Sequence, residues 1–229
     1  MLLFYQPDLV NGATYLDREE SRHCIKVLRK RQNDPIHITD GQGCLYSGII
    51  TNADPARCKF KIDNKKEEKR KDFSVHIAIA PTKNMDRLEW FVEKATEIGI
   101  DEITPLKTSN SERTAVKIER LDKKAIAAMK QSLKCRLPKI NDISAFEDLV
   151  KLSADFKSIA YVDASNSVML SQNVGKGVNY ILIGPEGDFT ETEVCLAQKL
   201  GWSKVSLGQS RLRTETAGLI ACHLINTFQ

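Results

Sequence analysis

The sequence has little that could support metal or disulfide chemistry. It contains six cysteines, none in a C-x-x-C pair, and four histidines, none in an H-E-x-x-H segment. Zinc sites need Cys and His at short, regular spacings, and disulfide-stabilised secreted domains carry denser cysteine frameworks. We therefore expect reduced thiols, no bound metal and a cytoplasmic protein.

Long hydrophobic runs are also missing. No segment approaches the roughly 20 apolar residues that a membrane-spanning helix needs. The first ten residues, MLLFYQPDLV, have no basic start and include Pro7 and Asp8, unlike a secretory signal peptide. We expect no association with a membrane.

Several common enzyme signatures are absent. No G-x-x-x-x-G-K-[ST] segment occurs, and no G-x-G-x-x-G follows an expected strand, which argues against a P-loop or a dinucleotide-binding fold. The segment GQSRL lacks the second glycine of the G-x-S-x-G nucleophile elbow of hydrolases. Hydrolase and metalloenzyme functions therefore lack their chemical groups.

The charge of the chain is small but unevenly distributed. The net charge is +4, and 41% of the residues are hydrophobic, which is typical of a soluble globular protein. Residues 1–72 contain 14 Lys and Arg against 11 Asp and Glu, and the remainder contains 20 against 19. Most of the positive excess therefore lies in the first third of the chain.

That first third, residues 1–72, is typical of a small β domain. Strand-like segments are separated by Gly-rich and Asn-Ala-Asp-Pro turns, which indicate antiparallel hairpins, and a small barrel would close them. Asp17, with Glu20 three residues later, indicates the start of one helix. The charged run 64–72 has no apolar anchor, so we expect a linker or exposed turn there. The expected strands are 2–6, 35–52 and 56–63.

From residue 73 onward, strands alternate with helices. This alternation predicts an α/β domain with a mostly parallel sheet over residues 73–229. Thr190 and Glu193 are spaced as a capping box for one helix, and Gly201 ends it. The expected strands are 74–80, 101–106, 158–162, 180–184 and 204–208. The apolar face expected for the last helix comprises Ala217, Ile220, Ala221, Leu224, Ile225 and Phe228.

Two loops of this second domain carry unusual polar content. Open parallel sheets bind ligands at the carboxyl ends of their strands, so the loops 184–190 and 208–217 are candidate sites. Gly184, Gly187 and Gly208 would allow a backbone to approach a ligand closely. Glycines after strands often merely end them, but two such loops in succession, one of them rich in charge, favour a site.

The same two loops resemble a known family. LIGPEGDFTETEV and LGQSRLRTETAGLIA are similar to the motifs of the bacterial 16S rRNA uridine-N3 methyltransferases, the RsmE type of the SPOUT (alpha/beta-knot) superfamily. The segments HCIKVLR, PTKNMDRLEWFVEKATEIGIDEITPL, SERT and KQSLKCRLP also match, in the same order. The resemblance covers nearly the whole chain.

The resemblance implies both architecture and partners. It implies an N-terminal PUA-like β-barrel that helps to hold rRNA, and a SPOUT-type trefoil-knotted parallel-sheet domain that binds S-adenosylmethionine. It also implies a homodimer whose substrate is 16S rRNA of the small ribosomal subunit. Knots are so rare that no periodicity or spacing predicts one, so this expectation depends on the resemblance alone.

The sequence departs from the family pattern at a few positions. Asp188 stands where the family usually has a second glycine, Leu212 replaces a common isoleucine, and Ser210 falls at a variable position. Leu133 and Lys134 replace a common Gly-Arg pair. This last change puts RNA contacts of that segment in question.

The implied site residues divide into a cofactor group and a reactive group. Arg211 and Arg213 would face uridine or phosphate and stabilise negative charge on the uracil oxygens, since arginine is permanently charged and bonds two acceptors at once. Either arginine could instead be solvated or paired with Glu186 or Glu215, and Glu215 could simply cap a helix. Glu186 is a candidate general base. The expected S-adenosylmethionine contacts are Ile183, Gly184, Pro185, Glu186, Gly187, Leu207, Gly208, Ser210, Leu212, Glu215, Thr216 and Ala217.

A basic helix in the first domain is the candidate rRNA contact. Arg22, Lys26 and Arg29 would share one helical face, and phosphate binding would be steeply salt-dependent. By composition alone such a run is ordinary solvated surface, and the resemblance favours RNA contact. The expected contacts are Arg18, Arg22, His23, Lys26, Arg29 and Arg31.

Two alternatives remain open at this point. One is a SPOUT methyltransferase that modifies tRNA, which the methylated nucleoside would distinguish. The other is a catalytically silent RNA-binding or ribosome-assembly protein, which failure to bind S-adenosylmethionine would favour.

Overall fold

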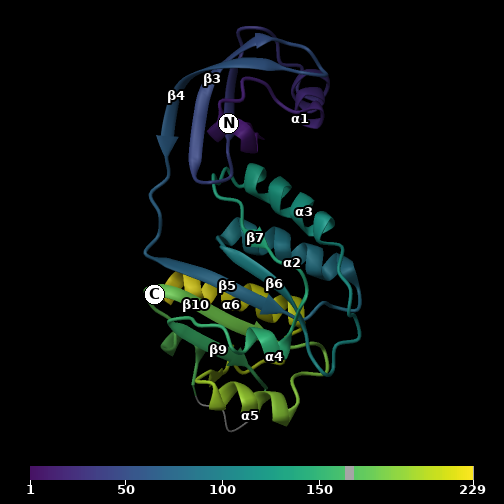
Figure 1. Ribbon diagram of the computed structural model, residues 1–229, viewed down its shortest axis with the longest axis vertical. Coiled ribbons are helices and arrows are strands. Elements are labelled where there is room, and N and C mark those ends of the chain that lie inside the picture. Colours follow the sequence, from purple (N-terminus) through teal and green to yellow (C-terminus); the bar gives the residue numbers. More distant parts are fainter. Residues whose placement is uncertain (163–167, 229) are drawn as a thin grey trace. The chain divides into compact units, whose positions relative to one another are not determined.

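The computed structural model describes residues 1–162 and 168–228. The chain forms two compact units (Figure 1). The first contains Met1–Arg70 and Ile126–Leu137, and the second contains Lys71–Ala125 and Pro138–Gln229. The segment 126–137 is distant in sequence from residues 1–72, and no local pattern assigns it to the first unit.

The first unit is built on a mixed four-stranded sheet. Its strand order is β1-β2-β3-β4, with β1 parallel to β2 and the other pairs antiparallel, so the expected hairpins are confirmed. Alternate strand residues such as Ile36, Ile38 and Ile50 are buried in one core. The strands are β1 (Leu3–Tyr5), β2 (Pro35–Thr39), β3 (Cys44–Asn52) and β4 (Lys59–Glu67).

Short helices connect β1 to β2. A 3-10 turn, η1 (Pro7–Asn11), precedes α1 (Arg18–Arg22), which continues into a π-helical turn, η2 (His23–Val27). The side chain of Asp17 accepts a hydrogen bond from the Glu20 backbone N–H at 2.8 Å, which confirms the predicted helix start. The side chain of Glu20 is buried and pairs with Lys130 of the same unit.

The second unit is built on a parallel sheet of order β11-β9-β10-β5-β6-β7, in which β8 also pairs with β6. The predicted α/β class and parallel sheet are therefore confirmed. The two-residue strands β7 and β8 were not predicted, because they are too short to show a pattern. The strands are β5 (Phe73–Ile79), β6 (Glu102–Lys107), β7 (Lys139–Ile140), β8 (Ser144–Ala145), β9 (Phe156–Ala160), β10 (Gly177–Ile183) and β11 (Ser203–Val205).

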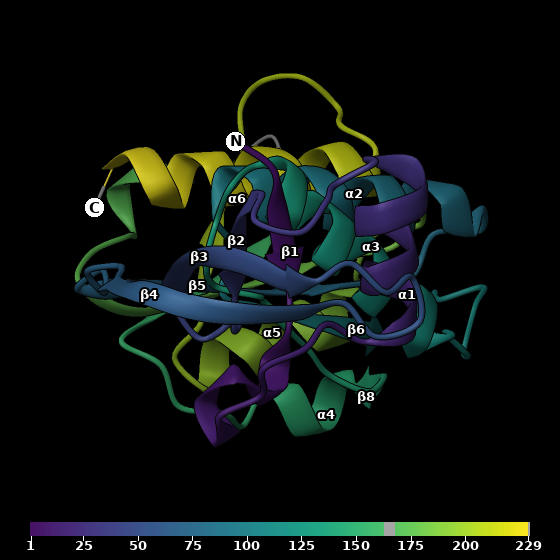
Figure 2. The same ribbon diagram turned by 90° about the horizontal axis from the view of Figure 1, so that it is seen from above.

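Helices cover both faces of this sheet. Figure 2 shows α2 and α6 on one side and α4 and α5 on the other. The capping box of α5 is confirmed: Thr190 Oγ1 accepts from the Glu193 N–H, and Glu193 Oε2 accepts from the Thr190 N–H. No helix in the described residues is long and apolar enough to cross a membrane. The helices of this unit are α2 (Met85–Ile98), α4 (Phe146–Leu149), η3 (Leu170–Gln172), α5 (Glu191–Lys199) and α6 (Thr214–Phe228). Helix α3 (Ile118–Gln131) begins in this unit and ends in the first one.

Helix α6 packs through a face that only partly matches the predicted one. It buries Gly218 and Cys222 together with Ala221 and Ile225, and it leaves Phe228 55% exposed. A Cβ atom at Gly218 would lie 2.8 Å from side-chain atoms of both Ile79 and Phe91. The missing side chain therefore lets α6 approach β5 and α2 closely, which hydrophobic periodicity cannot indicate because glycine adds no apolar side chain.

Candidate functional site

The loops that follow β9, β10 and β11 open into one cavity of about 1030 Å³. In the sheet, β9 lies between β10 and β11, so the carboxyl ends of these strands are adjacent. The lining residues are Ala160, Tyr161, Val162, Met169, Ile183, Gly184, Pro185, Glu186, Asp188, Val205, Ser206, Leu207, Gly208, Gln209, Ser210, Arg211, Leu212, Arg213, Thr214 and Ala217.

Two glycines shape this cavity by the lack of a side chain. A Cβ atom at Gly184 would lie 3.1 Å from the Phe189 ring and 3.3 Å from Asp188 Oδ1. Gly208 has a φ of +131°, a conformation that other residues rarely adopt. Thr214 Oγ1 donates to the Gly184 carbonyl at 3.1 Å, which ties the start of α6 to the loop after β10.

Most of the predicted cofactor contacts line this cavity, but Gly187, Glu215 and Thr216 do not. The Glu215 carboxylate is buried and pairs with the Arg87 guanidinium at 3.8 Å. Together with Thr216 it lines a separate small hollow beside α2. The geometry therefore gives Glu215 a role in joining α6 to α2.

Four charged side chains line the cavity: Glu186, Asp188, Arg211 and Arg213. Both arginines are exposed. Glu186 Oε1 accepts a hydrogen bond from the Lys83 backbone N–H at 3.3 Å, so this carboxylate contacts the loop after β5. Burial raises the pKa of the Asp188 carboxyl, while backbone N–H donors and the charge of Arg211 oppose that rise.

Several lining residues were not among the predicted contacts. Ala160 ends β9 and Tyr161 and Val162 follow it, and the carboxyl-end rule could have found them if it had been applied to that strand as well. Met169 reaches the cavity because its segment pairs with Ser206, a long-range contact that no sequence pattern shows. The other lining residues absent from the prediction are Asp188, Val205, Ser206, Gln209 and Thr214.

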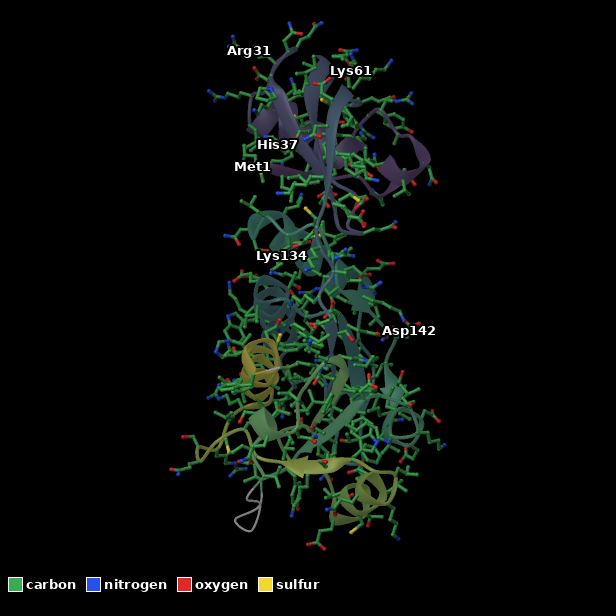
Figure 3. All side chains as sticks on the ribbon, turned by 90° about the vertical axis from the view of Figure 1, so that its left-hand side faces the viewer. Met1, Arg31, His37, Lys61, Lys134 and Asp142 are labelled. Atoms are coloured by element: carbon green, nitrogen blue, oxygen red, sulfur yellow. The ribbon has the colours of Figure 1, made fainter. Side chains whose placement is uncertain are left out.

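The predicted basic helix lies in the first unit, and all six of its expected RNA contacts are exposed. Arg29 has a φ of +55° and lies beyond the end of the π-helical turn at Val27, so it does not continue a helical face with Arg22 and Lys26. That part of the prediction is wrong, because a single α-helical period was assumed. Arg31, labelled in Figure 3, lies in the loop before β2.

The six cysteines form no disulfide bond in the part of the chain that the structure describes. Within residues 1–162 and 168–228, no group of three or more His, Cys, Asp or Glu side chains is placed to hold a metal ion.

The family follows from comparison with known proteins. An RNA methyltransferase domain matches residues 68–226, and an RNA methyltransferase PUA domain matches residues 16–63. The chain belongs to the RNA methyltransferase family. A relative from Mesomycoplasma hyopneumoniae (strain 232), named ribosomal RNA small subunit methyltransferase E, is 32% identical over 85% of this chain and 86% of its own length.

Solved structures of this methyltransferase family extend the similarity to the whole chain. A Porphyromonas gingivalis protein, described as a probable rRNA-methyltransferase, is 40% identical, with a TM-score of 0.93 over 100% of this chain and 98% of its own. The ribosomal RNA small subunit methyltransferase E of Neisseria gonorrhoeae, bound to S-adenosyl methionine, is 26% identical, with a TM-score of 0.86 over 99% and 97% of the two chains.

Proposed function

We propose that this protein transfers a methyl group from S-adenosylmethionine to N3 of a uridine in 16S rRNA of the small ribosomal subunit. The observation that carries this proposal is the cavity after β9, β10 and β11, which has Arg211 and Arg213 in its lining. The relatives named for small-subunit rRNA methylation support the choice of RNA. Such a protein would work in the cytoplasm, with its ribosomal substrate.

The cavity fits the cofactor by size and by the character of its lining. Its volume of about 1030 Å³ is just above the range typical of small-molecule sites, which is about 300–1,000 Å³. Ile183, Leu207 and Leu212 offer apolar contact, and Gly184 and Gly208 leave backbone open to a flat ring. The S-adenosylmethionine bound to the Neisseria relative supports this assignment.

The protein has two main tasks in this reaction: to align the methyl group with uridine N3, and to accept the proton that N3 carries. S-adenosylmethionine supplies a methyl group on a positively charged sulfur; its carbon–sulfur bond breaks as the carbon–nitrogen bond forms, so alignment lowers the barrier. Uridine N3 carries a proton at neutral pH, and we assign the exposed carboxylate of Glu186 to accept it. Arg211 and Arg213 would stabilise the negative charge that develops on the flanking uracil oxygens.

The direct test is to identify the methylated nucleoside. Purified protein would be incubated with isotopically labelled S-adenosylmethionine and unmodified small-subunit particles, bare 16S rRNA or tRNA, and the products analysed by mass spectrometry. N3-methyluridine from a ribosomal substrate alone is the expected result. Label in tRNA alone, or none in any RNA, would contradict the proposed substrate.

We propose that the exposed basic residues of α1 and η2 hold the rRNA. Replacing both Arg22 and Lys26 with alanine should weaken RNA binding about 10-fold and reduce the slope of log affinity against log salt by about 1 to 2, because two phosphate contacts are lost. Filter binding across a salt series would measure both, and the affinity for S-adenosylmethionine should not change. Lys59→Ala with Lys61→Ala, on exposed positions of β4, is the matched control. An unaltered salt slope would remove this role from the helix.

We also propose that the protein works as a homodimer through α6. Ile220 and Leu224 are half-buried and Phe228 is 55% exposed, so one side of this helix lacks full apolar cover. That side continues from Ala217, which lines the cavity, so a second copy would lie close to the site.

Leu224→Asp should convert the dimer to monomers, because a charge buried in an apolar interface is strongly unfavourable. Light scattering would measure the mass, and circular dichroism would verify folding. His223→Asp, at the neighbouring exposed position, should leave the dimer intact. A monomeric unaltered protein, or a folded dimeric Leu224→Asp variant, would refute this arrangement.

A further inference from the structure

One carboxylate of the cavity is bonded to the loops after two neighbouring strands. Asp188, in the loop after β10, accepts a hydrogen bond from the Phe189 N–H at Oδ1 (2.8 Å) and from the Val162 N–H at Oδ2 (3.2 Å). Val162 belongs to the segment after β9, and both Val162 and Asp188 line the cavity. The side chain of Asp188 therefore links two walls of the proposed donor site.

The backbone of Asp188 adds a third loop to this junction. Its carbonyl accepts from Asn110 Nδ2 at 3.0 Å, and its N–H donates to the Pro185 carbonyl at 2.9 Å. Asn110 lies in the loop after β6. Loops from β6, β9 and β10 thus meet at a single residue.

The conformation of Asp188 is one that glycine adopts more readily. Its φ is +62°, in the left-handed region, and it occupies the position where the family resemblance predicts glycine. Aspartate tolerates this region better than most residues. A glycine here would adopt this φ without strain, but it would offer no acceptor to the Val162 N–H. Aspartate has a slightly strained backbone here and provides that acceptor.

Packing holds only one of the two residues of this wall: Tyr161 packs against the core of the second unit, whereas Val162 does not. The side chain of Val162 is 70% exposed, so burial does not anchor it. The neighbouring Tyr161 N–H bonds to the Val205 carbonyl at 3.3 Å, a long hydrogen bond. Val162 lacks such packing, and its N–H bonds to the Asp188 carboxylate.

We propose that Asp188 is a positioning residue for the methyl donor, which orders the Tyr161–Val162 wall of the cavity through its hydrogen bond to the Val162 backbone. The inference rests on the proposed placement of S-adenosylmethionine in this cavity. It does not depend on which nucleotide is methylated. The proposal gives a role to the side chain of Asp188, which stands where the family pattern usually has glycine.

The experiment compares Asp188→Gly and Asp188→Asn by calorimetric binding of S-adenosylmethionine and by initial rates of RNA methylation. Asp188→Gly keeps the backbone conformation and loses both acceptors, so the donor Kd should rise about 10-fold while kcat at saturating donor changes by less than about 2-fold. Asp188→Asn keeps one oxygen acceptor and should recover part of the affinity. This split between Kd and kcat, with partial rescue, would not follow from a general loss of folding.

Two further variants make the outcome decisive. Asn33→Gly places glycine at another left-handed position, with a φ of +71° in the first unit, and should leave donor binding unchanged. Ala217→Phe fills the cavity itself.

If Ala217→Phe removes donor binding and both Asp188 variants bind normally, the role of Asp188 is wrong and the donor site stands. If Ala217→Phe binds the donor normally, the donor lies elsewhere and both assignments fail. If Asp188→Gly does not fold, an unchanged Kd in Asp188→Asn overturns the inference.

Discussion

Replacing Arg211 or Arg213 with alanine is expected to lower kcat by about 100-fold to 1,000-fold while leaving the Kd for S-adenosylmethionine within a few-fold of its original value. Removing one donor that stabilises developing negative charge typically has an effect of this size. Both side chains are exposed and line the cavity, so neither change should disturb the core. Single-turnover methylation of small-subunit particles, with separate calorimetry of donor binding, would measure the two quantities.

Lysine at either position makes the test sharper. Arg211→Lys and Arg213→Lys keep the charge but lose the planar pair of donors, so an intermediate rate would indicate bidentate contact with the uracil oxygens. A variant with unchanged kcat and unchanged RNA affinity would show that its arginine is only solvated. A weaker RNA affinity at unchanged kcat would indicate phosphate contact instead.

The second large effect is expected from Ala217→Phe. Ala217 lies on the first turns of α6, lines the cavity and is half-buried, so a phenyl ring there would enter the proposed donor site. We expect the Kd for S-adenosylmethionine to rise roughly 100-fold, from steric overlap worth about 1–3 kcal/mol, with methylation lost at ordinary donor concentrations. Isothermal titration calorimetry is the measurement.

A matched variant separates blocking of the cavity from damage to the helix. His223→Phe adds the same ring at an exposed position of α6 outside the proposed dimer face and should bind the donor normally. Thermal unfolding of both variants would detect any loss of stability. Tight donor binding by Ala217→Phe would place the cofactor outside this cavity.

The assignment of Glu215 shows where reasoning from the sequence was limited. A polar cluster at the start of an apolar helix indicated a ligand site, and Arg211, Arg213 and Ser210 do line the cavity. Glu215 has the same local setting but turns toward Arg87 of α2. Helical residues one or two positions apart face different directions, so only the placement of α2 decided which group Glu215 meets.

The composition of the first unit shows the same limit of reasoning from the sequence, because it combines the N-terminal residues with segment 126–137. The hairpins of the first unit follow from alternation and turn residues, which act over a few positions. The inclusion of 126–137 depends on contacts such as those of the Cys135 carbonyl with Thr39 Oγ1 at 3.1 Å and with the Gly43 N–H at 2.7 Å. Partners nearly a hundred residues apart leave no periodic signal.

The sequence by itself determined the class of fold, the alternation of the longer strands and helices, the capping residues and the two loops after β10 and β11 that line the cavity, because these follow from local periodicity, turn chemistry and motif. Tertiary structure decided the rest. It determined that α6 packs closely at Gly218, and it placed Tyr161, Val162 and Met169 in the cavity lining. It also brought three loops together at Asp188. Each of these depends on which distant atoms fill the available space, and local patterns carry no information about that.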